Sequence, residues 1–129
     1  MSIASTIARY LAGVIFLIFG LNGFLHFIPL PPPEGVAGQF MAALFVSHYL
    51  TVIFAVQVIG AILLLVNRYV PFALAMLAPV IVNILCFHAF MAPSGLPQAL
   101  LVTVLWVLIF VDVRPAFVGL FQSRLQSRA

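Results

Sequence analysis

Charge is the scarcest property of this chain. Only 5% of its 129 residues are charged, and its five basic residues are all arginine, since the sequence contains no lysine. A soluble domain could not cover its surface with so few charges, because 66% of the residues are hydrophobic and the mean hydropathy is +1.33. Isolated arginines also lack the clustering that nucleic acid requires. We therefore expect the lipid bilayer as the partner and no nucleic acid.

Cysteine is nearly absent as well. The single Cys86 excludes an internal disulfide and any Cys-x-x-Cys redox motif. An apolar helical segment would leave its thiol unreactive, which favours a packing role. Long polar stretches are missing too, so the chain has no room for a soluble catalytic domain.

What the chain does contain is enough apolar sequence for four membrane spans. A bilayer core about 30 Å thick takes about 20 helical residues to cross. We therefore predict an all-α fold, a transmembrane four-helix bundle in which residues 1–129 form one domain. Its predicted spans are residues 7–28, 48–66, 70–90 and 98–113. We expect the first span to be retained, because it is too long for a signal peptide.

Two further stretches are amphipathic. Residues 34–47 predict a short outer interfacial helix between the first two spans, after a proline-rich turn. The residues on its apolar face are Val36, Phe40, Ala43 and Leu44. The tail after Arg114 predicts an amphipathic surface helix. It groups apolar Phe117, Leu120, Phe121 and Leu125 against polar Gln122, Arg124 and Arg128.

The arginines indicate an orientation. With four spans, all of them fall on one side of the bilayer, at positions Arg9, Arg68, Arg114, Arg124 and Arg128. The loops on the other side carry only Glu34 as a charged residue. Because cytoplasmic loops are enriched in basic residues, we predict that both termini are cytoplasmic.

Polar side chains recur at one depth near the outer boundary. Polar groups inside a span are costly and often mark functional sites. We predict an outward-facing pocket formed mainly by the first and third spans. Its candidate ligand-binding residues are Asn22, His26, Gln57, Asn83 and His88. A structural alternative stays open, in which the amides bond neighbouring helices and the histidines are hydrated at the interface.

The surroundings of this pocket suggest its ligand. Phenylalanines could form an apolar wall, and His or Asn could bond a carbonyl, so a quinone or another lipid-soluble ligand fits best. Haem between His26 and His88, or a metal held by the histidines and Glu34, is less well indicated because ligand spacing is absent. We predict no catalytic residue and favour a ligand-binding or accessory subunit. The alternatives are a quinone-, haem- or metal-dependent oxidoreductase subunit and a small transporter or channel.

Several short segments resemble those of a known family. They are Arg9-Tyr-Leu-Ala-Gly13, Phe19-Gly20-Leu-Asn22-Gly23, Gly38-Gln39-Phe40, Gln57-Val-Ile-Gly60, Asn67-Arg68 and Val82-Asn83-Ile-Leu-Cys-Phe-His88. Together they resemble the DoxX family of small four-helix bacterial membrane proteins, over nearly the whole chain. The resemblance implies a multi-pass protein of the bacterial inner membrane, in a family named after a subunit associated with a thiosulfate:quinone oxidoreductase. Glycines on the spans would also permit a homo-oligomer or docking in a larger membrane complex.

Overall fold

The computed structural model describes residues 1–124, whose regular structure is entirely helical and contains no strand. The elements are α1 (Ile3–Leu25), α2 (Gly35–Val46), α3 (Tyr49–Leu65), α4 (Val70–Phe90), the 3-10 helix η1 (Pro93–Gly95), α5 (Leu96–Val113) and the 3-10 helix η2 (Arg114–Phe121). The predicted all-α class is confirmed. Span 70–90 coincides with α4, whereas α1 begins four residues before the predicted span 7–28.

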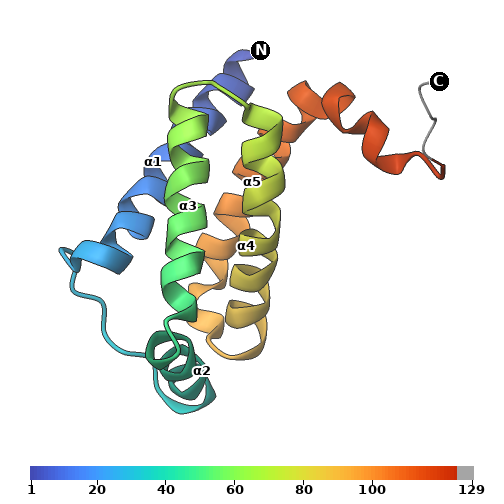
Figure 1. Ribbon diagram of the computed structural model, residues 1–129. Coiled ribbons are helices and arrows are strands. Elements are labelled where there is room, and N and C mark those ends of the chain that lie inside the picture. The colour runs from blue at the N-terminus through green and yellow to red at the C-terminus, as the bar shows by residue number, and fades with distance from the viewer. Residues whose placement is uncertain (125–129) are drawn as a thin grey trace.

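Four long helices run side by side (Figure 1). α1 packs against α3 and α5, and α4 packs against the same two helices. α1 and α4 therefore lie diagonally opposite each other. Several apolar helices could span a membrane. Three segments are long and apolar enough alone, namely Ile3–Leu25, Val70–Phe90 and Pro93–Phe121, and α2 with α3 gives a fourth if this pair, bent by 85°, is one span.

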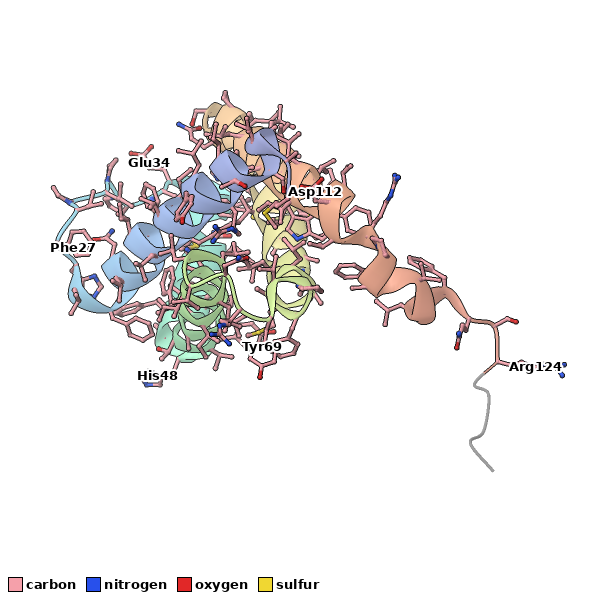
Figure 2. The ribbon with its side chains drawn as sticks, turned by 90° about the horizontal axis from the view of Figure 1, so that it is seen from above. Phe27, Glu34, His48, Tyr69, Asp112 and Arg124 are labelled. Atoms are coloured by element: carbon pink, nitrogen blue, oxygen red, sulfur yellow. The ribbon has the colours of Figure 1, made fainter. Side chains whose placement is uncertain are left out.

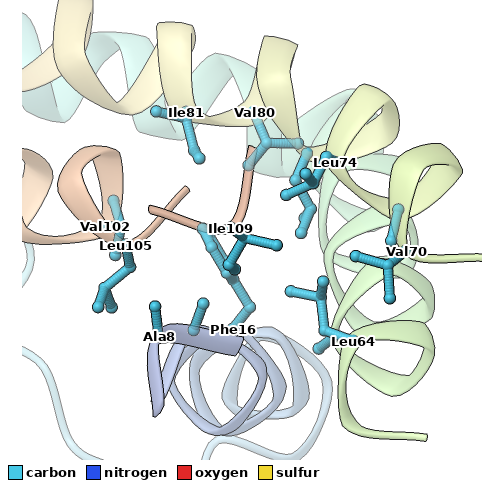
Figure 3. Packing of buried hydrophobic residues seen from close by; sticks show 14 of the residues in the cluster. Ala8, Phe16, Leu64, Val70, Leu74, Val80, Ile81, Val102, Leu105 and Ile109 are labelled. Atoms are coloured by element: carbon cyan, nitrogen blue, oxygen red, sulfur yellow. The ribbon is translucent and has the colours of Figure 1, made fainter. Parts of the chain in front are cut away.

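The space between the helices is filled mainly by aliphatic side chains, with Phe16 and Phe117 as the buried aromatic residues of the cluster. Figure 3 shows Phe16 of α1 and Ile109 of α5 meeting Leu64 of α3 and Leu74 of α4, all at most 2% exposed. The opposite faces remain apolar, and α5 exposes Val104 by 54%. Exposed apolar faces around an apolar core are the pattern of helices that meet lipid.

Small residues bring α1 close to α3. A Cβ added to Gly20 would lie 2.8 Å from Cγ2 of Val58, and one added to Gly13 would lie 2.7 Å from Cδ2 of Leu65. At distances this short, a side chain on either position of α1 would require its neighbour on α3 to shift. The expectation that glycines permit close helix approach is confirmed here.

The two ends of the molecule differ in charge. The start of α1, the α3–α4 turn and the end of α5 lie together at one end (Figure 1). The main-chain N–H of Ser2 donates to the Asp112 carboxylate over 2.6 Å at this end. Arg68 and Arg114 belong to the segments gathered there, whereas Glu34 caps α2 at the opposite end. The segregation of charge along the sequence is therefore a segregation in space.

Helix α2 forms where the sequence predicts it but presents a different face. It meets α3 at 85° and lies at the end of the molecule opposite the N-terminus (Figure 1). The face toward the protein is Ala37, Met41 and Leu44, while Val36 is 64% exposed. Of the predicted apolar face, Val36, Phe40 and Ala43 are exposed and Leu44 is half-buried, so most of this face points away from the protein.

The predicted amphipathic surface helix at the C-terminus is corrected in part. Residues 114–121 form a 3-10 helix that ends at Phe121, and Figure 2 shows this segment projecting away from the other helices toward Arg124. Only Phe117 is buried, with its ring 5.1 Å from that of Phe110. The rest of the predicted helix, with Leu125 and Arg128, lies outside the described residues.

Candidate functional site

The side chain of Asn22 binds the main chain of the segment that follows α1. It is 8% exposed. Its Oδ1 accepts from the main-chain N–H of Ile28 at 2.7 Å, and its Nδ2 donates to the carbonyl of the same residue at 3.2 Å. Both ends of the amide are thus engaged by one backbone position, which fixes the path of the chain beyond the helix. This role is structural, but the partner is the segment after Asn22's own helix and not a neighbouring helix.

Two of the histidines occupy left-handed backbone positions. His26 is the C-cap of α1 with φ of 54°, and its N–H donates to the carbonyl of Asn22. His48 is the N-cap of α3 with φ of 64°, at the corner between α2 and α3. Histidine is among the residues that tolerate this conformation. Both side chains are exposed.

Gln57 joins α3 to α1. It is 6% exposed, and its Nε2 donates to the main-chain carbonyl of Phe16 over 3.2 Å. Its Cγ lies 3.5 Å from where a Cβ on Gly20 would be, so the missing side chain makes space for it. Gln57 therefore stabilises the α1–α3 contact.

Asn83 and His88 point to different surroundings on α4. Asn83 is exposed, and its Nδ2 donates to the carbonyl of Pro79 in the same helix at 2.8 Å. His88 is half-buried, and its Nδ1 lies 3.1 Å from the carbonyl oxygen of Ala92. A Cβ on Gly95 would overlap the imidazole of His88. The imidazole is thus packed into the turn between α4 and α5.

The structure does not bring the five predicted side chains together. The pocket expected between the first and third spans would need α1 and α4 to meet, and these helices are diagonal. Asn83 and His88 lie about 140° apart on an ideal helix, and Asn83 is exposed, so Pro79 does not bring both side chains to the inner face of α4. Any role of these residues in binding a ligand stays a prediction.

A small open hollow lies instead at the outer corner of the molecule. Its volume is about 90 Å³. The residues that line it come from α1, α2 and α3, and are Gly23, Phe45, His48, Leu50, Thr51 and Phe54. The Phe54 ring also packs edge-on against Phe24, with centroids 6.3 Å apart. The hollow thus combines aromatic walls with one imidazole and one hydroxyl.

Sequence reasoning placed His48 only at a span boundary. The available signal was the short polar step Ser47-His48 between two apolar helical segments, which indicates a corner. Figure 2 shows His48 on the periphery, well separated from Glu34. This separation also removes Glu34 from the metal set that the sequence suggested. Among residues 1–124, no three His, Cys, Asp or Glu side chains group to hold a metal ion.

Arg9 has a role that its place in the sequence did not reveal. The sequence indicated a charge at the entrance of a span, yet Arg9 is only 5% exposed. Its Nη1 donates to the carbonyls of Leu64 and Leu65 at the end of α3, at 2.5 and 3.4 Å. Its Nε and the hydroxyl of Ser5 are buried without a hydrogen-bond partner in the described chain. The Asp112 carboxylate at the same end of the molecule accepts from the main-chain N–H of Ser2.

The expected packing role of Cys86 is wrong, because its side chain is exposed on α4.

Comparison of the chain with protein-family models, curated proteins and solved structures finds no match. The geometry of the chain itself therefore carries the functional argument.

Proposed function

We propose that the protein is a four-span protein of the bacterial inner membrane, DoxX-like, with both termini in the cytoplasm. Support comes from the apolar outer faces of the long helices and from the clustering of Arg68 and Arg114 with the start of α1. Basic residues favour the cytoplasmic side. α2 and the hollow then lie at the extracytoplasmic boundary.

The fourth crossing in this proposal is α3. Its 17 residues extend about 26 Å, slightly less than a bilayer core of about 30 Å. It runs beside α1 over much of its length and is joined to it by Gln57. A helix packed in this way between two longer ones extends over a similar depth. α2 then lies near the membrane surface, at 85° to α3.

We further propose that the protein is a non-catalytic, ligand-binding subunit of a membrane redox complex. Its ligand is a lipid-soluble ring compound of the quinone class, bound in the hollow at the outer corner. The observation that carries this proposal is the chemistry of the lining. Phe45 and Phe54 offer apolar ring faces, and the exposed imidazole of His48 offers a hydrogen-bond donor to a quinone carbonyl.

The hydrogen bonds of the buried polar side chains also favour the hollow as the ligand site. Asn22 and Gln57 bond main-chain atoms within the protein, so they are engaged before any ligand arrives. His48 has its side chain exposed at the mouth of an apolar cavity. Among the predicted polar layer it is the group best placed to meet a ligand that arrives from the bilayer.

A photoreactive quinone analogue tests this proposal in lipid vesicles that contain the full chain. We expect covalent labelling to map by mass spectrometry to the peptide with His48, Thr51 and Phe54. His48→Ala should reduce the labelling about twofold to tenfold, the effect of losing one hydrogen bond at an open site. Thr103→Val is the matched control, because Thr103 bonds the carbonyl of Ala99 in its own helix. Labelling spread evenly over the lipid-facing helices and unchanged by His48→Ala would contradict the proposal.

A further inference from the structure

An unsatisfied amide lies in the outward face of α4. Asn83 is the only carboxamide that is exposed more than one turn from both helix ends in α1, α3, α4 and α5 as the structure describes them. Its single side-chain hydrogen bond within residues 1–124 is from Nδ2 to Pro79. The carbonyl Oδ1 and the second N–H are free. Lipid chains around a membrane-spanning helix offer these groups no hydrogen-bond partner.

The residues around Asn83 form a continuous exposed strip along α4, called here the α4 outer face. On an ideal helix they lie within about 100° of one another. They are all exposed, and comprise Phe72, Ala75, Pro79, Asn83, Cys86 and Phe90. Ala75, Pro79 and Cys86 are small, whereas Phe72 and Phe90 at the two ends are large. The face is therefore an exposed, mostly apolar strip that contains one polar side chain, Asn83.

We propose that the α4 outer face is covered by the same face of a second copy of this chain, with Asn83 bonded to Asn83 of the other copy. The proposal rests on the membrane insertion proposed above and is independent of the ligand. A carboxamide carries both a donor and an acceptor, so it is complementary to itself. A two-fold axis along the membrane normal would bring each residue of α4 opposite its own copy at the same depth.

This arrangement satisfies the groups that α4 leaves free. Each Oδ1 accepts the second N–H of the opposite amide, and the bond to Pro79 is retained. The small residues on either side of Asn83 permit the two helices to approach closely. Cys86 lies one turn from Asn83 on the same face, so the two thiols of the dimer come near each other.

Oxidative crosslinking tests the dimer, because Cys86 is the only cysteine of the chain. With copper phenanthroline in vesicles, we expect the wild-type protein to form a disulfide-linked dimer. Asn83→Leu should weaken association about threefold to thirtyfold, as measured by energy transfer between labelled copies on dilution in lipid. Gln98→Leu removes an exposed amide near the start of α5 and should leave association unchanged. In a second control, Cys86→Ser with Val104→Cys moves the thiol to α5 and should abolish the crosslink.

Three results would overturn the proposal. They are the absence of a Cys86 crosslink in the wild-type protein, equal association of Asn83→Leu and wild type, and a crosslink from Cys86 to a different polypeptide. Quinone labelling near His48 is measured on the same vesicles. Labelling that persists without a dimer separates failure of this inference from failure of the proposed function.

Discussion

The guanidinium of Arg9 donates to the main-chain carbonyl of Leu64 and so joins the start of α1 to the end of α3. The last carbonyls of a helix have no partner within it and carry the negative end of its dipole. Arg9 supplies a positive charge there and is itself held 4.4 Å above the ring of Tyr10. At the end of the molecule proposed to be cytoplasmic, the buried guanidinium of Arg9 therefore holds α1 and α3 together.

We expect Arg9→Ala to lower the free energy of unfolding by about 1.5–3 kcal/mol, because charge-assisted hydrogen bonds to buried carbonyls are lost. Denaturant titration of the purified protein in micelles measures this difference. Arg68→Ala, at an exposed arginine in the α3–α4 turn, serves as the control and should change stability little. Equal effects of the two substitutions would show that Arg9 contributes only charge.

The close contact between α1 and α3 gives a second prediction. Gly20→Ala places a methyl group 2.8 Å from Val58 and should cost about 1–3 kcal/mol through overpacking. Val58→Ala in the same chain should recover most of that loss, which a double-mutant cycle measures as a coupling energy. Additive effects would mean that the helices separate freely at this point.

Asn22 should act on the segment that follows α1. Asn22→Ala removes both hydrogen bonds to Ile28, so we expect the Ile28 amide to exchange its hydrogen faster. Hydrogen-exchange mass spectrometry of the 26–33 peptide measures this. The α4 peptide around Leu77, far from the change in sequence and fully buried, is the internal control. An unchanged rate at Ile28 would return Asn22 to the set of possible ligand contacts.

The left-handed conformation of His26 predicts an order of stability. A side chain with a branched β-carbon costs most at this φ, and glycine costs least. We expect His26→Gly to equal or exceed the wild type, and His26→Val to be about 1–2 kcal/mol less stable than His26→Gly. Thermal unfolding in detergent measures the order. A least stable His26→Gly would indicate that the imidazole itself makes a contact.

The helices were predictable from the sequence because apolar length and turn residues decide them locally. Pro29 with the proline-rich turn, Asn67 with Tyr69, and Pro93 separate the helical segments, and the structure breaks near each of them. The position of the arginines at one end of the molecule also follows from the sequence, because successive spans run in opposite directions. For these reasons the fold class and span 70–90 needed no tertiary information.

The site could not be predicted in the same way, because its residues are assembled by packing. The fold decides that α1 and α4 lie diagonally opposite each other, and this arrangement separates Asn22 on α1 from Asn83 on α4. The burial of Arg9 depends on where α3 ends, and the hollow depends on the corner that His48 makes after α2. An apolar helix such as α2 carries no pattern that indicates its inward face.

The central claim is that the chain crosses the membrane four times with its arginine-bearing end in the cytoplasm. Single cysteines at Ser94→Cys, Asn67→Cys and Ser123→Cys, each combined with Cys86→Ser, test it in spheroplasts with a membrane-impermeant maleimide. The account predicts that Ser94→Cys is labelled in intact spheroplasts and that the other two are labelled only after lysis. Labelling of Asn67→Cys in intact spheroplasts, or protection of Ser94→Cys, would contradict it.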